Sequence, residues 1–194
     1  MAGSARYTAV LDACVLHPAP VRDLLLSLAA AGLYHARWTD QIQAEWIGSL
    51  LARRPDLDRH KLQRTADLMA EAVPDCLVKD YAWMIDALRL PDPDDRHVLA
   101  AAVAGHADAI VTFNLYDFPQ AVLAPFEIEA QHPDDFVMNQ FELHELIAID
   151  AVRGMRQRLR NPPMSAALLT DTLERCGLPQ SANYLRRLPI SRLI

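Results

Sequence analysis

The segment from Leu90 to Phe118 constrains the fold more than any other stretch, because it joins a helix pattern to a buried-strand pattern. Apolar residues recur at helical spacing from Val98 onward, which predicts a helix, and Gly105 is placed to end it with a left-handed C-cap. The run AIVTF, residues 109–113, is typical of a strand buried on both faces. A helix followed by a buried strand is half of a βαβ unit, so the segment predicts an α/β fold.

Acidic residues lie near the ends of two predicted strands. In open α/β sheets ligands bind beyond the carboxyl ends of the strands, where Asn114 and Asp117 follow the strand at 109–113. Near the start of the chain, the apolar run from Ala9 to Leu16 carries one charge, Asp12, in its middle. A charge inside a buried strand is costly unless it is paired or binds a metal ion. Asp12 is therefore either a ligand residue or a cap for a nearby loop.

These motifs, in this order, resemble the PIN-domain family of metal-dependent ribonucleases, and the VapC-type toxins of bacterial toxin–antitoxin pairs in particular. The resemblance rests on Asp12, on Glu45 of the second predicted helix, on the stretch DPDDRHVLAAAVAGHADAIVTFN that begins at Asp92, and on the following Asp-Phe pair. It covers roughly residues 6 to 138 and implies a three-layer α/β/α fold with a central, mainly parallel sheet. We therefore expect a PIN-like nuclease domain over residues 1–138 and a helical C-terminal extension over residues 139–194.

The resemblance also implies a site. Asp12, Glu45, Asp95 and Asp117 would be the metal-binding acids, and Asn114 would orient water or phosphate. Carboxylates are hard oxygen ligands, so a cluster without His or Cys favours Mg²⁺ or Mn²⁺ over zinc. One or two such ions lower the pKa of a water and hold the attacking and leaving oxygens of a phosphodiester. The expected activity is that of a Mg²⁺-dependent endoribonuclease, the toxin of a type II toxin–antitoxin pair.

Several residues near the predicted site have more than one assignment. Asp92 and Asp94 either share the site or cap the following helix, a role that Asp performs well, and the spacing to the apolar run favours Asp95 as the ligand. His97 falls on a different helix face and is expected at the surface. Thr112 is placed to hydrogen-bond a ligand carboxylate.

Other elements follow from the same patterns. Asp40 is a credible N-cap for the helix that carries Glu45, since Gln43 stands three positions on. A short strand is predicted within residues 33–38, an edge strand at 76–78 and a last strand around 126–130. Helices are predicted at 21–31, 57–73, 143–159, 165–176 and 179–188.

Charge divides the chain. Residues 1–150 hold 11 Lys+Arg and 23 Asp+Glu, a net charge of −12, whereas residues 151–194 hold 8 and 2, a net charge of +6. We expect the basic tail to meet something negative, which is RNA phosphate, a partner or the acidic body itself. The family resemblance implies an RNA substrate, a cognate antitoxin and a homodimer.

Composition and motifs exclude several other classes. No apolar run approaches the ~20 residues of a membrane span and no signal-peptide pattern is present, so a cytoplasmic protein without a membrane partner is expected. Cys14, Cys76 and Cys176 form no CxxC and are expected to be reduced, buried thiols. A haloacid-dehalogenase-type phosphatase needs an acid two positions after Asp12, where Cys14 stands. The alternative from another class is a non-catalytic PIN-like domain that acts as a binding or scaffold module.

Overall fold

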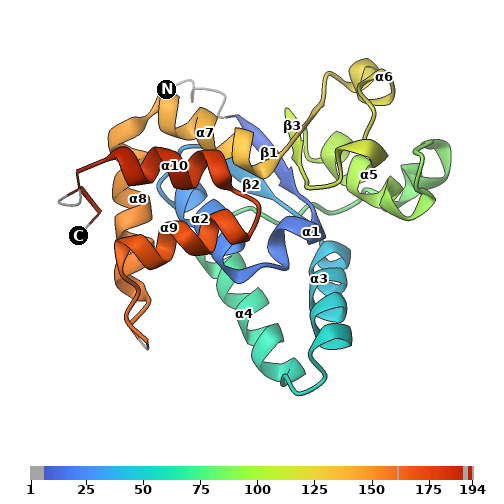
Figure 1. Cartoon of the computed structure of the whole chain (residues 1–194). Helices are drawn as coiled ribbons and strands as arrows, with labels where there is room; N and C mark the ends of the chain where they lie inside the picture. Colours follow the sequence, from blue (N-terminus) through green and yellow to red (C-terminus); the bar gives the residue numbers. More distant parts are fainter. Residues whose placement is uncertain (1–6, 161, 190–191, 194) are drawn as a thin grey trace. The chain divides into compact units, whose positions relative to one another are not determined.

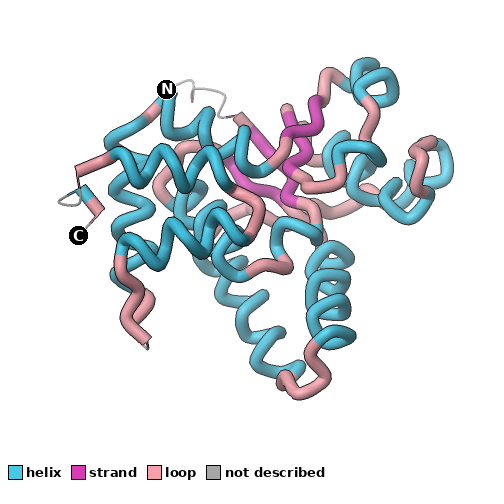
Figure 2. The backbone as a smooth tube through the Cα atoms, in the orientation of Figure 1, coloured by secondary structure: helices cyan, strands magenta, loops and turns pink. Residues whose placement is uncertain are grey.

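The computed structural model describes residues 7–160, 162–189 and 192–193 and contains a parallel sheet and many helices (Figure 2). The strands are β1 (Thr8–Leu11), β2 (His35–Arg37), β3 (Ala109–Val111) and β4 (Glu129–Gln131). Their order in the sheet is β2-β1-β3-β4, and each neighbouring pair is parallel. The predicted α/β fold with a central parallel sheet and additional C-terminal helices is confirmed.

The chain divides into two units (Figure 1). Unit 1 comprises the described residues up to His17 and the segment Tyr34–His132. Besides the sheet it contains α1 (Ala13–Leu16), α3 (Asp40–Arg53), α4 (Arg59–Ala72), α5 (Arg96–Ala104) and α6 (Gln120–Leu123). It also contains the 3₁₀ helices η1 (Ala82–Ala87), η2 (Pro93–Asp95), η3 (Leu115–Asp117) and η4 (Ala124–Phe126).

Unit 2 combines Pro18–Leu33 with the described residues from Pro133 onward. Its helices are α2 (Ala19–Ala30), α7 (Pro133–Leu143), α8 (Glu145–Arg158), α9 (Ala166–Arg175) and α10 (Pro179–Arg187). Helix α2 packs against α8, and α10 packs against α7 and α9. An early segment of the chain therefore shares a core with the C-terminal helices, a grouping that the linear pattern does not indicate. In the part of the chain that the structure describes, no helix is long and apolar enough to cross a membrane.

The core of unit 1 is built around β1, β3 and the helix α5, which contacts both strands. Each residue of β3 is fully buried, as the continuous apolar run predicts. Strand β1 ends at Leu11, so the expectation that Asp12 lies inside a strand is wrong. Asp12 instead stands at the N-cap position of α1, and its backbone N–H donates to Val111 O at 3.1 Å. The Asp12 side chain therefore lies at the carboxyl end of β1, directly after the last residue of the strand.

Two predicted helix caps differ from the structure: Gly105 is the C-cap of α5 as predicted but is not left-handed, and the predicted N-cap of α3 is wrong. Gly105 has a φ of −82°, and the left-handed residue is His106, with a φ of 49°. Glycine is required at position 105 by space, because an added Cβ would lie 2.9 Å from Ala101 O and 3.0 Å from Val78 Cγ2. The N-cap of α3 is Thr39, whose side chain accepts from Ile42 N at 3.0 Å, so Asp40 is the first helical residue.

The segment 76–78, predicted as an edge strand, forms an isolated parallel bridge between Leu77 and Trp38. Trp38 N donates to Cys76 O and Val78 N donates to Trp38 O, at 2.9 and 2.8 Å. The segment therefore pairs in parallel as predicted, but the pairing is a single bridge and too short to form a strand. The three cysteines are free, as expected, but only Cys76 is buried, so the predicted burial of Cys14 and Cys176 is wrong.

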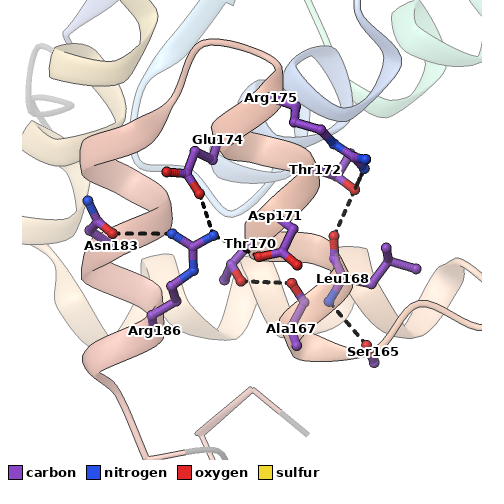
Figure 3. A network of polar contacts seen from close by, with 10 residues as sticks. All are labelled: Ser165, Ala167, Leu168, Thr170, Asp171, Thr172, Glu174, Arg175, Asn183 and Arg186. Carbon is purple, nitrogen blue, oxygen red and sulfur yellow. Dashed lines mark hydrogen bonds and ion pairs between the residues drawn. The ribbon is translucent and has the colours of Figure 1, made fainter.

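The arginines of the basic tail contact groups of their own unit. Arg156 donates to the carbonyl oxygens of Leu193 and Met164, and Arg158 donates to Ser27 Oγ at 2.7 Å. On α10, Arg186 lies 2.7 Å from Asp171 and 2.5 Å from Glu174, two acids of α9 (Figure 3). These contacts join the helices of unit 2, so part of the tail's positive charge serves the packing of the tail itself.

Candidate active site

Acidic side chains lie at the carboxyl ends of β1 and β3, the two central strands of the sheet. These strands pair in parallel with Leu11 opposite Val111, so the residues that follow them, Asp12 and Thr112, are neighbours. Thr112 Oγ1 donates to Asp12 Oδ2 at 2.7 Å, and both side chains are buried. The predicted hydrogen bond from Thr112 to a carboxylate of the site is thus confirmed, and it fixes the orientation of Asp12.

Cys14 is a second neighbour of the Asp12 carboxylate. Its Sγ lies 3.0 Å from Asp12 Oδ2, and Phe113 N donates to the sulfur at 3.2 Å. Burial raises the pKa of the Cys14 thiol to about 12, and the negative charge of Asp12 adds to the effect. The group is therefore a neutral thiol near pH 7, and it donates its proton to Asp12 rather than acting as a nucleophile.

Three carboxylates from two separate turns come close together. Asp92, Asp95 and Asp117 each offer an oxygen atom, and these atoms lie within 4.8 Å of one another. Asp92 and Asp95 flank the first turn before α5, and Asp117 ends η3 after β3. Asp92 also caps its own turn by accepting from Asp94 N at 2.8 Å.

The pKa of Asp95 is affected by burial and by the charges of several neighbouring acids. It stands at the N-cap position of α5, yet its side chain makes no capping hydrogen bond. Burial and, after it, the charges of Asp12, Asp92 and Asp117 raise the pKa of Asp95 from 3.8 to about 7, while His97 acts in the opposite direction. Asp12 is therefore close enough to Asp95 to act on its titration.

His97 is buried, so its predicted surface position is wrong. Its exposed fraction is 3%, and its Nε2 lies 2.9 Å from Glu45 Oε1, which places the N–H toward the carboxylate of α3. Its Nδ1 is also buried and has no hydrogen-bond partner among the described residues. The sequence did carry a signal for this position, since Ala101, one helical turn on, belongs to the apolar face of α5.

Asn114 lies beside Asp117 and donates its side-chain amide to that carboxylate. Its backbone N–H donates to Thr112 Oγ1 at 3.0 Å, so Thr112 connects Asn114 to Asp12. Asp94, in contrast, is exposed and does not belong to the close carboxylate triplet. Glu45 lies outside the triplet as well and connects to α5 through His97.

The donor set fits a hard divalent cation. The triplet offers oxygen atoms alone, and repulsion from Asp12, Asp92 and Asp117 adds to burial in raising the pKa of Asp95. A bound cation would remove that repulsion, and carboxylate oxygens are the ligands that Mg²⁺, Mn²⁺ and Ca²⁺ prefer. Asp12 and Asp117, which follow two adjacent strands, and Asp92 and Asp95, which precede α5, can therefore hold a divalent ion against a phosphate group.

Comparison with known proteins gives matches to both parts of the chain. A PIN-domain family model matches residues 8–116, and a model described as the VapC50 C-terminal domain matches residues 133–187. A Mycobacterium tuberculosis (strain ATCC 25618 / H37Rv) protein with the name "Putative ribonuclease VapC50" is 45% identical over 94 residues. The alignment covers 48% of this chain and 55% of that protein, so the chain spans about half the length of this curated relative. No solved structure matches the chain.

Proposed function

Because this chain belongs to the PIN-domain family, we propose that it is a Mg²⁺-dependent endoribonuclease and the toxin of a type II toxin–antitoxin pair. The observation that carries the proposal is the carboxylate triplet of Asp92, Asp95 and Asp117 beside the strand end that holds Asp12. The name of the similar mycobacterial protein, which describes a ribonuclease, supports the same reaction. Mn²⁺ is a second ion that these donors would accept.

The residues divide into ligands and residues that position them. Asp12, Glu45, Asp95 and Asp117 are the proposed metal-binding acids, and Asp92 joins them on the geometry of the triplet. Bound Mg²⁺ would lower the pKa of a water and neutralise charge on the phosphodiester.

The positioning residues donate hydrogen bonds to the acids. Thr112 and Cys14 donate to Asp12, and Asn114 donates to Asp117. His97 is buried against Glu45, so we assign it a positioning role rather than proton transfer. With these hydrogen bonds in place, the acids are oriented before a ligand arrives, which reduces the cost of ordering them on binding.

The proposed partners follow from the family. We infer an RNA substrate, a cognate antitoxin and a homodimer, in a cytoplasmic protein. We also infer a nuclease domain over residues 1–138 and a helical extension over residues 139–194, whose helices α9 and α10 form part of the core of unit 2.

A cleavage assay on single-stranded RNA tests the proposal. The purified chain should cleave RNA with Mg²⁺, lose cleavage in EDTA and regain it when Mg²⁺ is restored. Asp12→Asn should abolish cleavage, whereas Asp94→Asn should cleave as the wild type does, because Asp94 is an exposed acid outside the triplet. Cleavage that persists in EDTA or in Asp12→Asn would contradict the mechanism. A folded protein that binds RNA without cleaving it would instead indicate a non-catalytic binding or scaffold module.

A further inference from the structure

An exposed aromatic side chain directly precedes Asp117, one of the proposed metal ligands. Tyr116 occupies the middle of η3, between Asn114 and Asp117, and its exposed fraction is 84%. It makes no hydrogen bond or ring contact within the described residues. The preceding residue, Leu115, is also exposed, at 42%. Two neighbouring apolar side chains therefore face solvent in a turn that carries a candidate metal ligand.

The backbone of this turn is fixed at both ends. Asn114 N donates to Thr112 Oγ1 at 3.0 Å, and Asp117 N donates to Asn114 O at 3.2 Å. Phe118, directly after the turn, is buried. Tyr116 is thus an aromatic ring on a backbone that is hydrogen-bonded to the site, and presenting it needs little ordering on binding.

The charge of the surroundings is unfavourable for RNA. Residues 97–132 contain no Lys or Arg, and they include Asp108, Asp117, Glu127 and Glu129. Proteins that bind nucleic acid through its backbone use clusters of basic side chains, and this part of unit 1 has none. Contacts to the bases would therefore add affinity that the side chains of this segment do not supply through phosphate. Stacking on an aromatic ring is such a contact, and it accepts any base because each base has a π-face.

We propose that Tyr116 is a stacking platform for one nucleobase of single-stranded RNA, next to the phosphodiester that is cleaved. Consecutive Cα atoms lie about 3.8 Å apart, so the ring is attached one residue from Asp117. In this arrangement, a base that flanks a phosphate held at the acids stacks on the ring. Bases of a duplex are stacked on their neighbours and do not offer a free face, so the platform selects unpaired RNA. This inference rests on the proposed ribonuclease function.

Substitution of Tyr116 separates ring stacking from other effects. With a 12-nucleotide single-stranded RNA of mixed sequence, Tyr116→Ala should raise KM about tenfold, which corresponds to about 1.4 kcal/mol. Its kcat should stay within about twofold of the wild type, and Tyr116→Phe should behave as the wild type because it keeps the ring. Melting temperatures of both variants should be unchanged, since the side chain is exposed. Trp83→Ala removes another exposed aromatic residue, from η1, and should leave KM unchanged.

An abasic scan of the same RNA identifies the stacked base. In the wild type, one abasic position beside the cleaved bond should raise KM about tenfold, and in Tyr116→Ala the same position should cause no further rise. Equal KM values for the wild type and Tyr116→Ala, independent penalties from the two changes, or an equal effect of Trp83→Ala would overturn the proposal.

Binding of the labelled oligonucleotide, measured by fluorescence anisotropy in EDTA, separates the two hypotheses. A wild type that does not cleave RNA but binds it more tightly than Tyr116→Ala does would refute the nuclease and support stacking. An active wild type whose binding matches that of Tyr116→Ala would refute stacking alone.

Discussion

The charge of Asp95 should destabilise the metal-free protein, and Asp95→Asn removes that charge. Burial, followed by the charges of Asp12, Asp92 and Asp117, raises the pKa of Asp95 from 3.8 to about 7. Because the folded pKa lies above the unfolded pKa, the folded state binds this proton more tightly. The resulting stability is fully present below about pH 4 and is lost as the pH rises through about 7. The penalty of the ionised group is therefore complete at pH 8.

The magnitude follows from two opposing effects. A pKa rise from 3.8 to about 7 corresponds to about 4 kcal/mol, which solvent screening of this half-buried group reduces to about 1–2 kcal/mol. Against this, a negative charge at the N-terminus of α5 stabilises the helix dipole by about 0.3–1 kcal/mol, and Asn loses that interaction. The penalty from burial and repulsion is therefore larger than the stabilisation from the helix dipole. Asp95→Asn should therefore stabilise the metal-free protein by about 1 kcal/mol at pH 8, or about 2–4 °C in melting temperature.

Thermal melts in EDTA at pH 8 and pH 5 test this, with Asp94→Asn as the exposed neighbouring control. Asp95→Asn should be more stable than the wild type at pH 8, with a much smaller difference at pH 5, and Asp94→Asn should show no such pH dependence. Mg²⁺ should raise the melting temperature of the wild type more than that of Asp95→Asn, because the variant has lost a ligand. A gain of equal size at both pH values, or a loss at pH 8, would refute the reasoning. Normal RNA cleavage by Asp95→Asn would remove Asp95 from the proposed ligands and leave Asp92 and Asp117 of the triplet.

The remaining predictions concern His97 and two glycines. His97→Leu should weaken Mg²⁺ binding in calorimetry because Glu45 loses its 2.9 Å donor, and His97→Gln should restore part of the affinity; equal affinity in both variants would contradict the positioning role. Gly105→Ala should destabilise the protein by about 1–3 kcal/mol in urea denaturation, because the new Cβ would lie 3.0 Å from Val78 Cγ2. Gly48→Ala, with nothing within 4 Å of the new Cβ, should instead stabilise α3 by about 0.5–1 kcal/mol, and similar effects at the two glycines would contradict the close-approach argument.

The sequence by itself determined the elements whose signals are local. The apolar spacing after Val98 predicts α5, and the run at 109–113 predicts β3, because burial of one helix face or of a whole strand imposes a period on neighbouring residues. The order of acids along the chain likewise indicates the PIN family, and the family model that matches residues 8–116 agrees.

Caps and boundaries were less well determined, because several neighbouring residues satisfy the same local rule. Thr39 and Asp40 are both good N-caps, and the backbone bends one residue earlier than the spacing favours. Gly105 was correctly singled out, but the reason is contact with Val78, which lies on another segment, and the left-handed conformation falls on His106.

Only the tertiary structure decided which polar groups meet. Glu45 lies against His97 of another helix, Asp117 joins Asp92 and Asp95 from a separate turn, and α2 shares a core with helices at the far end of the chain. A local pattern tells which face of an element is buried, but a buried polar side chain is stable only with a partner, and that partner comes from whichever segment the fold places opposite. The sequence therefore indicates which residue types form the site. Which of these side chains contact one another is set by the packing of segments distant in the chain.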